Sequence, residues 1–287
     1  MTLPDPRAAV ARLMGVPALS AHPLGGAAYE VRLENQDGVL AKTDARPGAI
    51  ASEVASLNWL AETRTVHTPR VREYDELWMV TDLIPTGRPD PLAAQDLGRQ
   101  LARLHRSGAP SFGSPPTGGP ATGTIGLAPM HNVEEDDWAT FYAAHRVEVY
   151  LKMAYDAGSL SSQQMETIHR VAQDIDRLAG PPEPPARLHG DLWSGNLLWG
   201  ADGRAWLIDP AAHGGHRETD LAMLKLFGAP QLGRIIDAYQ QEYPLSAGWE
   251  SRTGLHQLFP LVVHAALFGG GYAAQAESAA ASALRAA

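Results

Sequence analysis

The chain reads Leu188-His189-Gly190-Asp191-Leu192-Trp193-Ser194-Gly195-Asn196, and Asp209 follows thirteen residues later. An aspartate with an asparagine five residues further on is the pattern of a kinase catalytic loop, in which the carboxylate accepts a hydroxyl proton and the amide holds a metal ion. A second aspartate, beyond a short hairpin, completes the metal site in that scheme. The spacing therefore predicts Asp191 as the catalytic residue and Asn196 and Asp209 as metal ligands.

The segment between Asn196 and Asp209 has the pattern of a β-hairpin. Two apolar runs, residues 197–199 and 205–208, flank the turn sequence Ala201-Asp202-Gly203. Paired strands would place Asn196 and Asp209 at the same open end, close enough to share a cation. The alternative is a loop of solvated aspartates beside a buried hairpin. Three polar groups at kinase spacing favour the metal site.

Composition limits the classes of protein to consider. The length of 287 residues suits one large domain or two lobes, and a net charge of -9 argues against a nucleic-acid partner. The absence of cysteine excludes disulfides, thiolate nucleophiles and cysteine-based zinc sites. Residues 1–15 lack the apolar core of a signal peptide, and the longest apolar stretch, residues 258–274, is too short and interrupted to span a bilayer. We expect a soluble cytoplasmic protein with no membrane partner.

Residues 1–84 have the features of a nucleotide-binding lobe. A short helix is expected over residues 1–15, and Gly25-Gly26 then precedes a hairpin that turns at residues 35–38 and returns as a strand carrying Lys42. Only three of the 23 basic residues are lysines, so a lysine inside a strand is notable. A helix from Pro47 carries Glu53, and such a lysine–glutamate pair fixes the α- and β-phosphate contact in kinase sites. Gly25 and Gly26 would let backbone N–H groups approach a triphosphate, although two glycines alone also fit a plain turn.

A predicted strand over residues 77–81 leads into Asp82, Leu83 and Ile84, which we interpret as the connector between two lobes. In folds of this kind the backbone of the connector holds the adenine, so the side chains at these positions carry little information. We therefore expect an α+β protein with an N-lobe of residues 1–84 and a C-lobe of residues 85–287.

The C-lobe is predicted to be mainly helical. Residues 111–126 are rich in Gly, Pro, Ser and Thr, which indicates a long surface loop. Ser161 and Gln164 form a capping-box pattern that begins one helix. The expected helices cover residues 92–105, 137–157, 161–178, 231–241, 254–268 and 273–287, the last of them alanine-rich and weakly held.

Residues 213–221 combine two histidines, a glutamate and an aspartate. Their spacing matches no common zinc pattern, so we expect His216, Arg217 and Glu218 to line the acceptor side of the cleft. Asp220 is expected to cap backbone N–H groups where a helix begins. Trp193 has two interpretations: its ring faces the acceptor, or it packs beneath the loop.

These motifs closely resemble the fructosamine kinase (ketosamine-3-kinase) family. The resemblance runs from about Leu24 to Tyr272 and is most specific in the loop of residues 188–196. The broader pattern of His-Gly-Asp, Asn and Asp is shared with aminoglycoside phosphotransferases and choline-type kinases. The resemblance is also carried by Ile208-Asp209-Pro210, Gly215-His216-Arg217-Glu218, Asp220-Leu221-Ala222, Phe112-Gly113, Ile125-Gly126, Asp137-Trp138, His145-Arg146, and Phe268-Gly269 with Tyr272.

The resemblance implies a bilobal protein-kinase-like fold that uses ATP and Mg²⁺ to phosphorylate the 3-hydroxyl of a ketosamine, either a ribulosamine or a fructosamine. The amine would belong to a small molecule or a protein, and the phosphorylated product would then release it. Some members carry a cysteine in the glycine-rich loop that allows redox-controlled dimerisation. Ala27 and Ala28 stand in that region here, and we expect a monomer.

Two alternatives remain open on the sequence. One is the same chemistry on an aminoglycoside, choline or another amino alcohol. The other is a catalytically silent kinase fold that binds a nucleotide and a partner. The presence of Lys42, Asp191, Asn196 and Asp209 together argues against the silent fold, which would not need all four.

Overall fold

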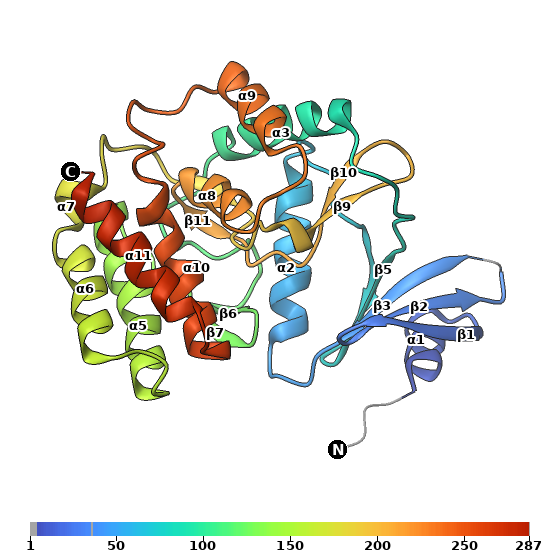
Figure 1. Ribbon diagram of the computed structural model, residues 1–287. Helices are drawn as coiled ribbons and strands as arrows, with labels where there is room; N and C mark the ends of the chain where they lie inside the picture. The colour runs from blue at the N-terminus through green and yellow to red at the C-terminus, as the bar shows by residue number, and fades with distance from the viewer. Residues whose placement is uncertain (1–4, 36, 287) are drawn as a thin grey trace.

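The computed structural model describes residues 5–35 and 37–286 and shows a small β-rich lobe beside a larger, mainly helical one (Figure 1). The small lobe contains an antiparallel sheet with the strand order β1-β2-β3-β5-β4. Its strands are β1 (Ala18–Gly25), β2 (Ala28–Leu33), β3 (Gly38–Thr43), β4 (Val71–Tyr74) and β5 (Trp78–Asp82).

The alternation of side chains along these strands builds a core on each face of the sheet. Along β5, Trp78 and Val80 pack toward α1 (Pro6–Met14), whereas Met79 packs against α2 (Ala49–Glu62). Lys42 of β3 pairs with Met79, so it lies on the face that α2 covers. This register brings the lysine and the helix together.

The sequence-based expectations for this lobe are largely confirmed. Helix α1 begins after the capping residue Asp5 and ends at Gly15, whose φ of 66° is left-handed. Helix α2 begins at Ala49, just after the predicted start. Residues 1–4 of the predicted first helix and Gln36 of the predicted turn lie outside the described residues. Strands β1 and β4 were not expected from the sequence.

The larger lobe consists of helices around the hairpin that carries the catalytic motif. Strand β9 (Leu197–Trp199) pairs with β10 (Ala205–Leu207), as predicted, and β8 (Ala186–Leu188) pairs with β11 (His213–Gly215). The helices are α3 (Pro91–Arg106), α4 (Trp138–Tyr142), a π-helical turn (Ala143–Val147), α5 (Glu148–Asp156), α6 (Ser162–Gln173), α7 (Ile175–Leu178), α8 (Glu218–Leu226), α9 (Leu232–Glu242), α10 (Thr253–Phe268) and α11 (Tyr272–Arg285).

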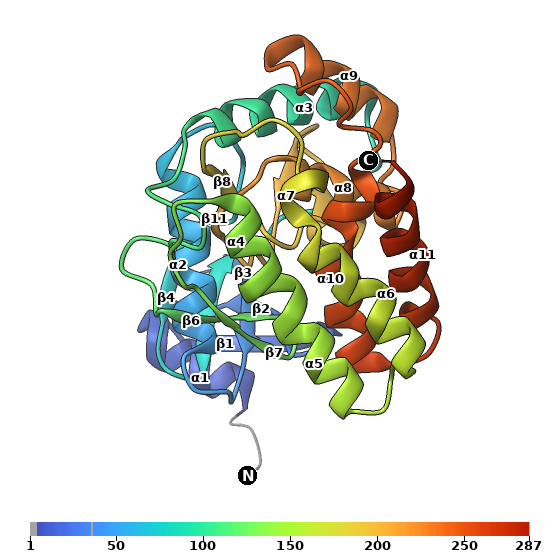
Figure 2. The ribbon, with the colours of Figure 1, turned by 90° about the vertical axis from the view of Figure 1, so that its left-hand side faces the viewer.

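Three details of this lobe differ from the expectations. The segment expected to be a loop, residues 111–126, contains β6 (Thr122–Ile125), which pairs with β7 (Ala128–His131). The helix expected over residues 161–178 is interrupted at Asp174, although its capping box is present. The terminal helix α11 is not weakly held: it packs against α10 and α6 and buries Ala276 and Ala280 completely (Figure 2). Small side chains allow this close helix packing.

No helix among residues 5–35 and 37–286 combines the length and the apolar character that crossing a bilayer requires.

Candidate active site

The catalytic motif follows β8 in a turn that its neighbours fix tightly. Gly190 has a φ of +81°, and a Cβ there would lie 2.0 Å from the carbonyl oxygen of Ala211. The backbone N–H groups of His189 and Gly190 donate to the carboxylate of Asp220, at 2.8 and 3.0 Å. Asp220 therefore caps backbone N–H groups, as expected, but they belong to the catalytic loop. Because α8 begins at Glu218, Asp220 lies in its first turn and points out of the helix toward the loop.

The turn places Asp191 in a partly buried position beside Asn196. The Asn196 amide Nδ2 donates to Asp191 Oδ2 at 2.9 Å and to the backbone oxygen of Asp191 at 2.9 Å. Burial raises the pKa of Asp191 to about 7, since the low-dielectric surroundings disfavour its charged form and the Asn196 hydrogen bond offsets only part of that effect. A carboxyl group with this pKa suits a general base at neutral pH.

The β9–β10 hairpin brings Asn196 and Asp209 to the same end, as the sequence pattern predicts. Asn196 immediately precedes β9, and Asp209 lies two residues after the end of β10. The N–H of Ile208 donates to the Asn196 carbonyl at 3.0 Å. Asp209 has a φ of +52°, a left-handed conformation that aspartate tolerates better than most residues. Its side chain is 47% exposed and thus accessible from the cleft.

Lys42 joins the two lobes through ion pairs. Its Nζ lies 2.8 Å from Glu53 Oε2 and 3.0 Å from Asp209 Oδ2. Burial disfavours the charged lysine, but the two carboxylates outweigh that effect and raise the pKa of Lys42. Lys42 therefore stays positively charged at the place where β3, α2 and the end of the β9–β10 hairpin meet.

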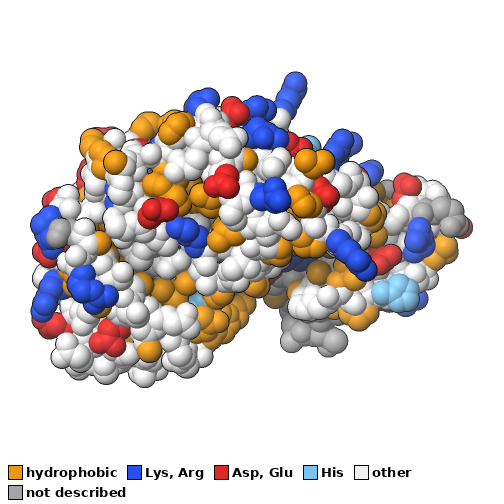
Figure 3. All heavy atoms as spheres, turned by 45° about the horizontal axis from the view of Figure 1, so that its top comes forward, with side chains coloured by type: hydrophobic (Ala, Val, Ile, Leu, Met, Phe, Trp, Pro, Cys, Tyr) orange, Lys and Arg blue, Asp and Glu red, His pale blue; other side chains and the backbone are white. Residues whose placement is uncertain are grey.

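A cleft of about 550 Å³ lies between the sheet and the β9–β10 hairpin. Apolar side chains of both lobes, including Leu40, Met79 and Leu198, form its walls. In Figure 3 the surface is hollowed between the small lobe and the large one, and hydrophobic side chains gather beside the hollow. The cleft is also lined by the predicted nucleotide-site residues Gly25, Gly26, Lys42, Glu53, Asp82, Leu83 and Ile84, together with Asp209.

The connector is fixed to the catalytic hairpin by backbone hydrogen bonds. Gly87 donates to the carbonyl of Trp199 at 2.6 Å, and Ala201 donates to that of Pro85 at 2.8 Å. The side chain of Asp82 is paired with Arg72. Asp82, Leu83 and Ile84 precede this anchored segment and line the cleft.

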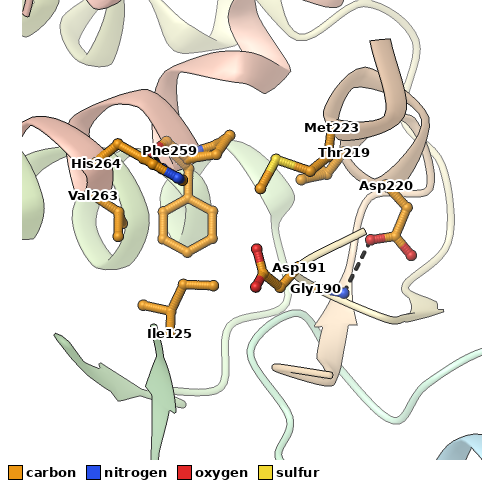
Figure 4. Close-up of a pocket in the computed structure, with 10 residues that line it drawn as sticks. Ile125, Gly190, Asp191, Thr219, Asp220, Met223, Phe259, Val263 and His264 are labelled. Carbon is orange, nitrogen blue, oxygen red and sulfur yellow. Dashed lines mark hydrogen bonds between the residues drawn. The ribbon is translucent and has the colours of Figure 1, made fainter. Parts of the chain in front are cut away.

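A second, smaller pocket lies at Asp191 (Figure 4). Its walls come from distant parts of the chain: Ile125 from β6, Met223 from α8, and Phe259 and His264 from α10. Sequence reasoning did not identify these residues individually, because isolated apolar residues and a histidine on a helix give no motif. Ile125 is the exception in part, because Ile125-Gly126 belongs to the resemblance described above.

The Trp193 ring packs against Gly195 of its own loop, where an added Cβ would lie 2.2 Å from the ring, and it is otherwise exposed. Its side chain is 37% exposed, and its ring meets that of Phe227 edge-on at a centroid distance of 5.6 Å. Phe227 in turn contacts His264, at 5.4 Å. An aromatic row thus runs from the Asp191 pocket to the surface, which favours the interpretation that Trp193 faces the acceptor.

The other three expected acceptor residues are placed elsewhere. Arg217 forms an ion pair with Glu183, and Glu218 accepts from Arg252 Nε at 3.0 Å. His216 stacks obliquely between Trp138 and His256, with centroid distances of 5.0 and 4.7 Å. All three are buried and none lines the Asp191 pocket. We therefore correct the expectation: the segment that leads into α8 and the first residue of this helix face the interior of the lobe, where these side chains pair with other buried groups.

The side-chain ligand atoms of His216, Glu218 and His256 lie within 4.8 Å of one another, which is close enough to share a metal ion. Glu218 already holds the guanidinium of Arg252, however, and a second cation would compete with that charge. We therefore interpret the cluster as structural.

The fold and the site together define a class of protein. Two lobes enclose a cleft of ligand size that is lined by the pair of Lys42 and Glu53 and by Asp209. Asn196 lies beside this aspartate and donates to Asp191. This is a protein-kinase-like phosphotransferase acting on a hydroxyl group. A solved structure of low sequence identity shares the fold. The choline kinase LicA of Streptococcus pneumoniae is 14% identical, with a TM-score of 0.65 over 97% of each chain.

A sequence model of the fructosamine kinase family matches residues 27–286, and the chain belongs to that family. YniA of Escherichia coli K12, named a probable ketoamine kinase, is 36% identical over 85% of this chain and 84% of its own. The chloroplastic protein-ribulosamine 3-kinase of Arabidopsis thaliana is 32% identical over 81% of this chain and 71% of its own. A crystal structure from Thermobifida fusca, provisionally named fructosamine-3-kinase, is 40% identical, with a TM-score of 0.91 over 99% of this chain and 100% of its own.

Proposed function

We propose that this protein transfers the γ-phosphoryl group of ATP to the 3-hydroxyl of a ketoamine, a sugar joined to an amine. The observation that carries the proposal is the position of Asp191, between the large cleft that holds Lys42 and Asp209 and a smaller pocket that opens to an aromatic row. The names of the relatives supply the class of acceptor. Ribulosamines and fructosamines are the two sugars to compare.

Asp191 is proposed to orient the acceptor hydroxyl and to take its proton as the new O–P bond forms. Asn196 holds the Asp191 carboxylate through its amide N–H, so the base keeps one orientation. Lys42, fixed by Glu53, would place its positive charge against the α- and β-phosphates. Each of these roles is positioning or charge neutralisation, which is what a loose phosphoryl-transfer transition state requires.

Asn196 and Asp209 are the proposed Mg²⁺ ligands. The donor set fits this ion, since Mg²⁺ prefers carboxylate and amide oxygens supplemented by phosphates and waters. The half-exposed carboxylate of Asp209 lines the cleft where those phosphates would lie. When bound, the ion would neutralise phosphate charge and help to align the transferred group.

The remaining assignments follow from the same site. The backbone of residues 82–84 would hold the adenine, and the turn at Gly25 and Gly26 would cover the phosphates. Trp193 is proposed to contact the sugar or its amine, with His264 beside it. We place the lobe boundary after Ile84, giving an N-lobe of residues 1–84 and a C-lobe of residues 85–287, and we propose that the protein acts as a monomer in the cytoplasm, where ATP is available.

The test is ATP turnover with ribulose-lysine, fructose-lysine, an aminoglycoside and choline, using the wild type, Asp191→Asn and the control Asp202→Asn. We expect turnover on a ketoamine and a loss in kcat of about 10²- to 10⁴-fold in Asp191→Asn only. Asp202 lies in the exposed turn of the same hairpin, so its loss should leave kcat unchanged. Turnover on none of the acceptors, with nucleotide still bound, would contradict the proposal.

A further inference from the structure

The β6–β7 hairpin contacts both lobes. Its base is fixed to the large lobe, where Tyr150 Oη donates to the carbonyl of Pro129 at 2.7 Å and Arg146 Nη1 donates to that of His131 at 2.9 Å. Its tip is fixed to the small lobe, where Arg46 Nη1 donates to the carbonyl of Gly126 at 2.7 Å. The hairpin is therefore a further connection between the lobes, far in sequence from residues 82–84.

Arg46 is well placed to transmit movement between the two sites. It lies in the short link between β3, which carries Lys42, and α2, which carries Glu53. The carboxylate of Asp44 fixes its guanidinium group, with Nη2 at 2.6 Å and Nε at 3.1 Å, and also accepts the Arg46 backbone N–H at 2.8 Å. These contacts leave Nη1 directed at the hairpin.

Helix α2 touches the same hairpin at a second point. A Cβ at Gly123 of β6 would lie 2.8 Å from Ser52 Oγ, so the strand and the helix are in direct contact there. Ser52 is the residue before Glu53, the partner of Lys42. A shift of the hairpin would therefore displace the helix that orients the nucleotide lysine.

The hairpin also reaches the Asp191 pocket. Ile125 of β6 is 4% exposed and forms one wall of this pocket (Figure 4). It is adjacent to Gly126, whose carbonyl Arg46 holds. The free space at Asp191 is only about 10 Å³, so an acceptor that enters must displace the walls of the pocket. Ile125 is one of these walls, and it continues into the segment that Arg46 and Ser52 contact.

We propose that the β6–β7 hairpin couples acceptor binding to nucleotide binding, with Arg46 as the positioning residue that joins the Asp191 pocket to Lys42 and Glu53. The inference rests on the proposed function, because it takes the Asp191 pocket as the acceptor site. We propose that the coupling is favourable, and because coupling is reciprocal each ligand then strengthens the binding of the other by the same factor. Its consequence is that ATP binds more tightly when an acceptor is present.

The experiment compares the wild type with Arg46→Met, which keeps the aliphatic stem and removes every donor. The dissociation constant of a non-hydrolysable ATP analogue with Mg²⁺ is measured alone and with a 3-deoxy ketoamine, which cannot react. We expect at least about 5-fold tighter binding with the ketoamine in the wild type and a ratio near 1 in Arg46→Met. The affinity for the analogue alone should not change. Arg46→Lys, which retains a donor, should recover part of the ratio.

Arg103→Met is the matched control, since Arg103 is an exposed arginine paired with Glu242 far from both sites. It should show the wild-type ratio. A wild-type ratio in Arg46→Met, or a ratio near 1 in the wild type, would overturn the coupling.

Hydrogen exchange separates this inference from the proposed function, because it needs no acceptor. The nucleotide analogue should slow exchange at residues 122–131 several-fold in the wild type and leave it unchanged in Arg46→Met. If no ketoamine binds but this protection is seen, the ketoamine assignment fails and the link between nucleotide and hairpin stands. If the analogue binds without slowing exchange at the hairpin in the wild type, the inference fails.

Discussion

At the scale of single residues, the turn that presents Asp191 depends on backbone conformation. Gly190 is left-handed and has the carbonyl of Ala211 against the position of its missing side chain. His189 is buried beside it, and burial lowers the pKa of its imidazole, so the ring stays neutral. The geometry also fixes its tautomer: Nε2 lies 3.0 Å from the carbonyl of Ile208, while Nδ1 faces the Asp191 N–H.

We expect Gly190→Ala to destabilise the protein by about 3 kcal/mol or more. A left-handed alanine costs roughly 1–2 kcal/mol, and the overlap with Ala211 adds about 1–3 kcal/mol. Urea unfolding would measure the free energy of unfolding, and the same variant should lose most of its kcat because Asp191 moves.

Gly203→Ala is the control for this prediction. Gly203 has nearly the same conformation, with a φ of +75°, but nothing lies within 4 Å of the position of its missing Cβ. It should show the backbone cost alone. Equal losses in the two variants would mean that the contact with Ala211 has no role.

At the scale of the element, the first turn of α8 is a buried charged junction. Glu218 accepts from Arg252 Nε at 3.0 Å, and His256 Nε2 lies 3.3 Å from Glu218 Oε2. Burial raises the pKa of Glu218, but the nearby His256 and the hydrogen bonds from Arg252 outweigh it and lower the pKa to about 2. The carboxylate is thus ionised in the folded state well below the pH at which it is protonated in the unfolded chain.

This shift predicts a specific loss of stability in acid. Between about pH 4.5 and pH 2 the unfolded state binds the proton that the folded state excludes, so stability falls as the pH falls. We expect this carboxylate to account for about 2 kcal/mol of the loss by pH 3.

Glu218→Gln should remove this part of the pH dependence, and at pH 7 it should cost about 3–5 kcal/mol because Arg252 is left buried without its partner. Urea unfolding between pH 6 and pH 3 would show it, with the exposed Glu250→Gln as control. Parallel pH profiles of the wild type and Glu218→Gln would contradict the assignment.

At the scale of the whole molecule, the two lobes meet around the cleft, and a ligand there should stabilise both together. A nucleotide analogue at 100 times its dissociation constant should add about 2.7 kcal/mol to the free energy of unfolding. For a chain of this size we expect an increase in Tm of roughly 5–10 °C.

The Mg²⁺-dependent part of this increase should disappear in Asp209→Asn. Asparagine tolerates the left-handed conformation of Asp209, so the substitution removes charge without straining the turn. Thermal melts with the analogue, in the presence of Mg²⁺ or of a chelator, would measure the effect, and Asp202→Asn should behave as the wild type. An undiminished Mg²⁺-dependent shift in Asp209→Asn would remove Asp209 from the proposed metal site.

The local features of the site could be predicted from the sequence because they depend on neighbours in the chain. The turn chemistry of residues 201–203 and the apolar runs beside it determine the β9–β10 hairpin, and that hairpin alone brings Asn196 near Asp209. Lys42 and Glu53 are eleven residues apart, joined by one strand-to-helix link. The family resemblance then supplied the reaction and the class of acceptor.

Tertiary structure decided what lies beyond the reach of local pattern. His216, Arg217 and Glu218 have the composition of a binding site, but the packing of α8 turns them inward to Glu183, Arg252 and His256. The wall of the Asp191 pocket combines residues from β6, α8 and α10, and the alanines of α11 are buried only because α10 and α6 lie against them. Burial and contact between distant segments are properties of the folded chain, and no short stretch of sequence encodes them.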